Sequence, residues 1–159
     1  MILMYHKVDI ICPTKWWVSV DTFRKHLAVL SAFDVVYLTD YDPLNERHCV
    51  ITFDDAYENI YNHAFPLMRQ LNYPFEVFVN GAFVSGWNDF DPREPYARIC
   101  DEEQLAVMAC HGGRMQWHTA THPDLTTLDD DTIAAELGVP DRFRKAFAPP
   151  HFSWLAYPY

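Results

Sequence analysis

Two adjacent carboxylates end a strongly apolar run in this chain. The stretch "ITFDDAYENIYNHAF", residues 51–65, has the pattern of a buried strand, and Asp54 and Asp55 follow where that strand stops. Adjacent aspartates repel each other, and neither strand nor helix packing requires the pair. An opposite charge is therefore expected nearby, and a metal ion is the obvious candidate. The alternative is that the two side chains only cap the helix that follows.

Two histidines occupy a similar place further along the chain. In "WHTATHPDL", His118 and His122 lie four residues apart at the end of the run "RMQWH", and Pro123 favours a tight turn in which the rings can converge. Two imidazoles and one carboxylate, with a position left open, are a common ligand set for a catalytic zinc or a similar divalent ion. In such a site one aspartate binds the metal and its neighbour stays free to act as a base.

Either pair alone is weak support for a metal site. Histidines spaced HxxxH are common at ordinary surface and core positions. The hypothesis depends on the conjunction, because both pairs fall at the carboxyl ends of predicted strands, where α/β barrels and open sheets build their sites.

Length, charge and cysteine content narrow the protein class. A chain of 159 residues with half of them apolar fits one domain with one core. The net charge of −10 argues against a nucleic-acid partner, which needs a basic surface, and no window approaches the length of a membrane span. The four cysteines show no CxxC spacing, so a zinc knuckle or a thioredoxin-type site is not expected.

The elements that must position these side chains alternate between short apolar runs and amphipathic segments. This is the pattern of β/α units around a mainly parallel sheet. Strands are expected over residues 2–6, 34–38, 49–53, 75–80, 114–118 and 153–159, and helices over residues 21–31, 58–71, 101–110 and 129–137. Pro66 is expected to bend the second helix. The long connection over residues 84–98, rich in Asp, Pro and aromatic residues, has the composition of a functional loop.

Three stretches carry a resemblance to a known family. "TFDD" at 52–55, "HTATH" at 118–122 and "AYPY" at 156–159 resemble, in order, the first three motifs of the polysaccharide deacetylase family, also called the NodB homology or carbohydrate esterase 4 family. The chain looks closest to the branch of poly-N-acetylglucosamine deacetylases. The resemblance implies an α/β fold, a distorted, TIM-like (β/α) barrel lacking its C-terminal strands. It also implies a single domain over residues 1–159 that is incomplete at its C-terminal end.

The resemblance also implies an activity and a role for each motif residue. The activity is that of a metal-dependent hydrolase that removes N-acetyl groups from an N-acetylglucosamine-containing polymer or oligosaccharide. Asp54 becomes the general base, and Asp55, His118 and His122 become the metal ligands. The backbone N–H of Tyr159 would hold the oxyanion. The expected cofactor is a divalent ion, zinc first, with cobalt, nickel or iron as alternatives.

Aromatic side chains in the predicted loops could bind a sugar. Tyr159 and Trp87 are the expected substrate-binding residues. The wider group of loop aromatics that could stack on a sugar is Trp16, Trp17, Trp87, Phe90 and Tyr96. Each of these rings could instead plug an edge of the core.

The chain departs from the family pattern at two points. Ala156 stands where many members carry an arginine that orients the catalytic aspartate, and the later histidine that protonates the leaving amine has no evident counterpart. His6 could face the site or be structural. Asp124 could orient a ligand imidazole or cap a turn.

These departures leave several alternatives. The chain could be part of a longer gene product, it could form a homo-oligomer through the open edge of its barrel, or it could be an inactive relative. The rival functions are accordingly a different C–N amidohydrolase on the same fold and a non-catalytic carbohydrate-binding protein.

Overall fold

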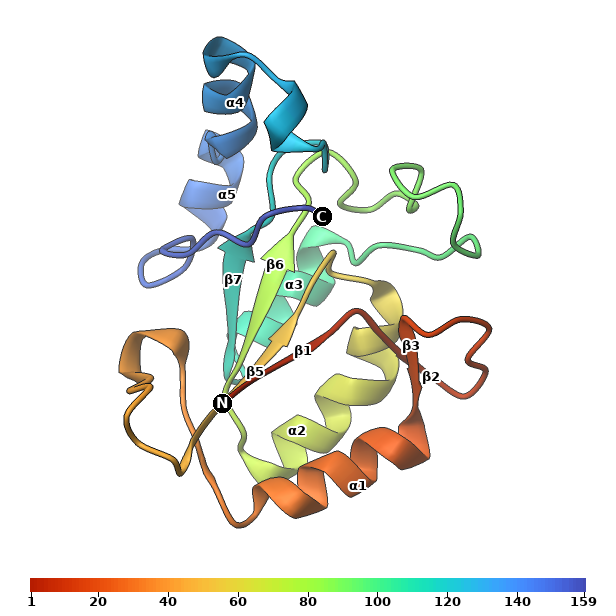
Figure 1. Ribbon diagram of the computed structural model, residues 1–159, viewed down its shortest axis with the longest axis vertical. Coiled ribbons are helices and arrows are strands. Elements are labelled where there is room, and N and C mark those ends of the chain that lie inside the picture. The colour runs from red at the N-terminus through yellow and green to blue at the C-terminus, as the bar shows by residue number, and fades with distance from the viewer.

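A parallel sheet forms the centre of the structure, a computed structural model that describes residues 1–159 (Figure 1). Its strands lie in the order β1 (Ile2–Tyr5), β5 (His48–Phe53), β6 (Phe75–Val79) and β7 (Gly113–Trp117), and β4 (Asp34–Val35) pairs with the start of β5. Every pairing is parallel. The inner strands β5 and β6 are almost wholly buried, as their continuous apolar sequences predict.

Helices follow the strands and cover the sheet. They are α1 (Val20–Leu30), α2 (Phe65–Leu71), α3 (Glu102–Ala109), α4 (Asp130–Leu137) and α5 (Asp141–Ala146). In α1 the Ser19 side chain accepts a hydrogen bond from the N–H of Thr22, and one face buries Phe23 and Leu27. The helices α4 and α5 lie beyond the carboxyl end of β7 (Figure 1). None of the helices combines the length and the hydrophobicity needed to cross a membrane.

The helix predicted over residues 58–71 differs from the expectation. A π-helical turn, Ile60–Ala64, leads into α2, and Pro66 lies in the first turn of α2. The residues before Pro66 are already helical, and the N–H of Phe65 donates to the carbonyl of Ile60, so Pro66 lies where the hydrogen bonding changes from π to α. The bend expected at Pro66 stays a prediction.

The strand predicted over residues 34–38 is also shorter than expected. Only β4 pairs, and a 3₁₀ turn, Leu38–Asp40, begins three residues after β4 ends. The N–H of Leu38 donates to Oε1 of the buried Glu76 at 2.9 Å, so this N–H serves a side chain instead of a sheet.

The strand predicted over residues 153–159 is wrong. This segment makes a single bridge, between Leu155 and Trp117. The N–H groups of Ser153 and Trp154 both donate to the side-chain oxygen of Gln116, which takes them out of any ladder. The last residues therefore run past the end of β7 as an irregular segment (Figure 1).

Two short strands were not predicted from the sequence. β2 (Lys7–Asp9) and β3 (Trp17–Ser19) pair in parallel as a separate two-stranded sheet that follows β1 directly. Because β2 begins two residues after β1 ends, it starts beside the carboxyl edge of the main sheet.

Candidate metal centre

The residues predicted to bind a metal lie at one edge of the main sheet. Asp54 and Asp55 follow β5, and His118 follows β7, with β6 between the two strands. The backbone continues each strand to its end, since Asp54 N–H donates to the carbonyl of Tyr5 and His118 N–H donates to the carbonyl of Val79. Parallel strands with this order bring the two motifs together although more than sixty residues separate them.

Three ligand atoms converge at this edge. Oδ1 of Asp55 lies 3.6 Å from Nε2 of His118 and 3.4 Å from Nε2 of His122. One ligand atom from each residue falls within 4.8 Å of the other two. The imidazole rings are 5.0 Å apart and inclined by 67°, so both can point at one centre. The predicted convergence of the two motifs is confirmed.

Hydrogen bonding and burial set the protonation of the two imidazoles. Nδ1 of His118 lies 2.9 Å from the carbonyl oxygen of Ala156, which can only accept, so this nitrogen carries the proton and Nε2 keeps its lone pair toward Asp55. Burial lowers the pKa of His118 to about 4 and also lowers the pKa of His122. Both rings are therefore neutral at neutral pH, which is the form that binds metals.

The chemistry of the donor set fits a divalent cation. It offers one unprotonated nitrogen from each of two neutral imidazoles and one carboxylate oxygen. Three protein ligands leave one coordination position open. Asn80, fully buried at the end of β6, donates from Nδ2 to Oδ1 of Asp55 at 2.7 Å and fixes the carboxylate. Asp55, His118 and His122 could hold a zinc-like ion; the geometry leaves the element open.

Asp54 is buried beside the ligands without joining them. Its side chain accepts no hydrogen bond from the chain and forms no ion pair, and it faces the cavity described below. Burial and then the charge of Asp55 raise the pKa of Asp54 to about 7. A cation held by Asp55 would oppose this rise, because it favours the ionised carboxylate. The arrangement leaves Asp54 free to exchange a proton.

A cavity of about 270 Å³ opens over these residues. That volume lies near the small end of the range for small-molecule sites. The side chains that line it, besides the predicted ligands and Asp54, include Met4, His6, Trp16, Phe90, Asp91 and Arg93. The cavity is therefore acidic at its floor and has aromatic rings in its walls.

The two predicted substrate-binding residues lie differently. The ring of Tyr159 is 5.2 Å from the ring of His122 and lines the cavity, and its backbone N–H makes no hydrogen bond within the chain. Trp87 does not line the cavity; its ring stacks on Tyr96 with centroids 4.7 Å apart. Its role as a sugar platform stays a prediction.

Sequence reasoning left two other positions open. His6 does line the cavity, and burial, followed by the charges of Lys7 and the two ligand histidines, lowers its pKa to about 4. Asp124 instead caps a short 3₁₀ turn, since its carboxylate accepts from the N–H and hydroxyl of Thr126. It does not orient a ligand imidazole.

Asn80 was missed in the sequence. Its signal is a single polar residue at the end of the apolar run "FEVFVN". That signal becomes informative only when β6 is known to lie between the strands that carry the ligands.

The backbone around the ligands is left-handed. Asp55 has φ of 69° and His122 has φ of 60°, and Ala56 and Thr119 also have positive φ. Residues with a Cβ pay about 1–2 kcal/mol for this conformation. The site is therefore built on turns that the surrounding structure must hold in place.

Comparisons with known proteins agree with this architecture. The sequence profile of the family described as "Polysaccharide deacetylase" matches residues 41–159. YxkH of Bacillus subtilis (strain 168), named as a candidate polysaccharide deacetylase, is 27% identical over 145 residues, which cover 86% of this chain and 48% of YxkH. The chain thus spans about half the length of this curated relative.

Two solved structures share the fold. The Streptococcus pyogenes deacetylase PplD in complex with acetate superposes with a TM-score of 0.79 at 22% identity and covers 99% of this chain and 72% of PplD. IcaB from Ammonifex degensii gives a TM-score of 0.73 at 19% identity and covers 99% of this chain and 74% of IcaB. The α/β architecture with its parallel sheet therefore matches the barrels of deacetylase structures, as the sequence predicted.

Proposed function

This chain belongs to the polysaccharide deacetylase family, and from that premise we propose that it carries the site of a metal-dependent hydrolase that removes N-acetyl groups from a polymer or oligosaccharide of N-acetylglucosamine. One observation carries the proposal. The Nε2 atoms of two neutral imidazoles lie within 3.6 Å of the Asp55 carboxylate, and the unligated carboxylate of Asp54 lies next to them in an open cavity.

The residues of the chain divide the work of the reaction. When bound, the divalent ion supplies Lewis-acid chemistry at the acetamide carbonyl and lowers the pKa of water. Asp55, His118 and His122 hold it. Asp54, which has no partner in the chain and faces the cavity, takes the proton of the attacking water. The free N–H of Tyr159 can donate to the oxygen that gains negative charge.

The proposed substrate is a polymer with β-1,6- or β-1,4-linked N-acetylglucosamine. The motif "AYPY", which lacks the arginine found in many family members, resembles the branch that acts on poly-N-acetylglucosamine. Aromatic walls such as those of Trp16 and Phe90 suit the apolar faces of sugar rings. Zinc is the proposed ion, with cobalt, nickel or iron as alternatives.

The decisive experiment measures acetate release. The protein is incubated with β-1,6- and β-1,4-linked N-acetylglucosamine oligomers, with and without EDTA, and then with Zn²⁺ added back. Acetate that appears with either linkage, disappears with EDTA and returns with Zn²⁺ supports the proposal. His118→Ala should release no acetate, and His111→Ala is its matched control, because His111 is exposed and lies away from the cavity.

Two other outcomes would replace the proposal. Oligosaccharide binding without acetate release would favour a non-catalytic carbohydrate-binding protein. Metal-dependent cleavage of a cyclic or linear amide without action on the oligomers would favour another C–N amidohydrolase.

A further inference from the structure

One wall of the cavity comes from the long connection between β6 and α3. This segment, residues 84–98, contributes Phe90, Asp91 and Arg93 to the cavity lining. The ring of Phe90 lies 4.6 Å from the ring of His122, so the segment also contacts a metal ligand. Its position therefore decides both the shape of the cavity and the packing around His122.

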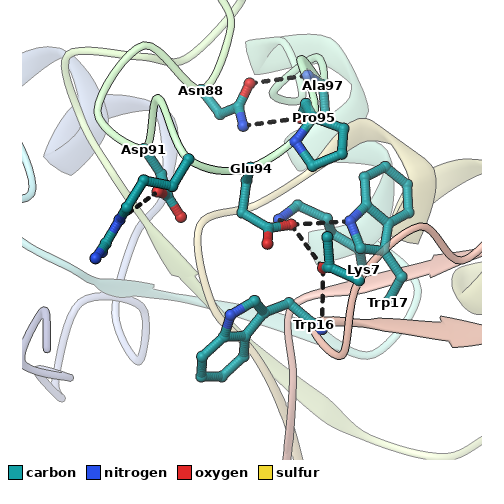
Figure 2. A network of polar contacts seen from close by, with 10 residues as sticks. Lys7, Trp16, Trp17, Asn88, Asp91, Glu94, Pro95 and Ala97 are labelled. Atoms are coloured by element: carbon teal, nitrogen blue, oxygen red, sulfur yellow. Dashed lines mark hydrogen bonds and ion pairs between the residues drawn. The ribbon is translucent and has the colours of Figure 1, made fainter.

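Contacts at the base of the segment and between its own residues fix its shape. Trp87 and Arg98 form an antiparallel bridge that closes the base. The buried Asn88 accepts a hydrogen bond from the N–H of Ala97 at 2.8 Å and donates to the carbonyl of Pro95 at 3.1 Å (Figure 2). These contacts set the shape of the segment but not where its tip rests on the rest of the molecule.

The polar contacts between the tip and the rest of the molecule come from one side chain, while Phe90 also packs on the ring of Phe83 at 4.8 Å. Oε2 of Glu94 accepts hydrogen bonds from Thr14 Oγ1 at 2.9 Å, from Trp17 Nε1 at 3.0 Å and from Lys7 Nζ at 3.2 Å (Figure 2). All three donors lie between 77 and 87 residues earlier in the chain, in the unpredicted β2–β3 unit and its connection. Glu94 thus joins this part of the cavity wall to the segment that contributes Trp16 to the lining.

The cation in this cluster has little contact with water. The side chain of Lys7 is 1% exposed and that of Glu94 is 8% exposed, and this carboxylate is the sole ion-pair partner of Lys7 within 4.0 Å. The Nζ atom also lies 4.2 Å from the centre of the Tyr57 ring and 5.3 Å from that of Trp17. A buried ammonium needs such compensation, so these contacts specify one position of Glu94.

We propose that Glu94 is a positioning residue of the site: its three hydrogen bonds to Lys7, Thr14 and Trp17 fix residues 84–98 as the cavity wall and hold Phe90 against His122. Substrate binding is the step that depends on it. The metal ligands themselves come from the ends of β5 and β7 and do not need the wall to assemble. The kinetic part of this inference rests on the proposed deacetylase function; the structural part does not.

The test compares Glu94→Ala with a conservative replacement. Glu94→Ala removes all three hydrogen bonds, and the KM for an N-acetylglucosamine oligomer is expected to rise about tenfold or more, with a much smaller change in kcat. In the double variant Lys7→Met/Glu94→Gln, the amide oxygen can still accept from Thr14 and Trp17 and no buried charge is left unpaired. Because Lys7 also lines the cavity, the KM of this double variant is expected to fall between those of Glu94→Ala and the unmodified protein, nearer to the unmodified protein.

Two readouts need no turnover. Deuterium uptake in Glu94→Ala should rise in residues 84–98 and stay unchanged in β5 and β7. In a titration with Co²⁺ alone, the affinity should stay within a few-fold while the visible absorption bands shift, because His122 loses the contact with Phe90. Glu103→Ala, an exposed glutamate in the first turn of α3, is the matched control and should change none of these.

Each outcome supports or contradicts the proposed role of Glu94. If Glu94→Ala leaves both the KM and the deuterium uptake of residues 84–98 unchanged, the inference is wrong. If Glu94→Ala does not fold, Trp17→Phe removes one donor without leaving a buried charge, and an unchanged KM and uptake there would count equally against it. If the unmodified protein releases no acetate, the proposed function fails, and the uptake and Co²⁺ spectra still test the role of Glu94.

Discussion

At the scale of single residues, the backbone turn at Asp55 directs two neighbouring aspartate side chains to different surroundings. Asp55 faces both imidazoles, while Asp54 faces the cavity without a partner. We expect Asp54→Asn to lower kcat by about 10²–10⁴-fold, because the variant loses only the proposed base. Acetate release and a Zn²⁺ titration measure the two effects separately.

The metal affinity of Asp54→Asn should stay within a few-fold of the unmodified protein. Asp131→Asn, at an exposed position in the first turn of α4, is the control. Full turnover in Asp54→Asn would show that another group takes the proton.

Asn80 orients the carboxylate of Asp55. Its Nδ2 donates to the ligand oxygen of Asp55 at 2.7 Å. Asn80→Ala should weaken metal binding by about 10–100-fold, since the carboxylate loses the group that orients it. Competition with a chelator measures this, and Asn62→Ala, which removes an exposed asparagine, is the control. Equal affinities in the two variants would contradict the supporting role.

The sequence could predict the metal ligands but not their support. Asp55, His118 and His122 stand in motifs whose residue types are typical of metal sites. Asn80 is one polar residue after a strand, and its meaning depends on the register in which Thr52 pairs with Glu76 and Phe53 with Val77. Registers between parallel strands are set by packing of the whole sheet, which no local pattern records.

At the scale of elements, the turn after β6 leaves no room for a side chain. A Cβ on Gly81 would overlap the ring of Trp117. That ring cannot move freely, because its Nε1 donates to the carbonyl of Glu136 at 2.9 Å and it is 2% exposed. We expect Gly81→Ala to lower the free energy of unfolding by about 1–3 kcal/mol in urea titrations.

Gly138→Ala is the comparison for this effect. The nearest atom to a Cβ there is a carbonyl oxygen at 3.3 Å, so the loss should be smaller. An equal loss in the free energy of unfolding in the two variants would mean that the ring of Trp117 moves to make room for the Cβ.

Helices and interior strands were predictable because their apolar periodicity is long enough to count. The short strands β2 and β3 were not, since three residues each carry no periodic signal. The segment 153–159 misled for a different reason. It is apolar enough for a strand, but the side chain of Gln116 captures two of its N–H groups.

At the scale of the whole molecule, the bonds of Glu94 join segments about eighty residues apart and should make part of the stability depend on pH. Burial opposes ionisation of Glu94, but hydrogen bonds from Thr14 and Trp17 and the charge of Lys7 outweigh it, so its pKa lies below the ordinary 4.5. A lowered pKa stabilises the fold above the unfolded value, and this contribution is lost as the pH falls through the folded one.

Between about pH 6 and pH 3, the free energy of unfolding should therefore fall more for the unmodified protein than for Lys7→Met/Glu94→Gln. Urea titrations at each pH measure the difference, and the other carboxylates cancel because both proteins carry them. Parallel curves would show that Glu94 adds nothing beyond neutral hydrogen bonds.

The edge of the main sheet bears on the predicted homo-oligomer. β1 pairs with β5 alone, and Ile2 is 49% exposed on it. An apolar, unpaired edge favours association, while a net charge of −10 opposes it, so self-association should increase with salt. Ile2→Lys should weaken it in sedimentation velocity more than Leu44→Lys, which makes the same charge change on an exposed loop. A monomer at every salt concentration would remove the oligomer from consideration.

The left-handed turns at Asp55 and His122 have a consequence for anyone who tries to make this protein more heat-resistant. Glycine adopts that conformation without cost, so a laboratory selection that rewards only survival at high temperature would favour glycine at these two positions. The selected proteins would be more stable but would lack two of the proposed metal ligands. Thermal stability and the proposed metal binding place opposite demands on Asp55 and His122. A screen must therefore select for activity as well as for stability.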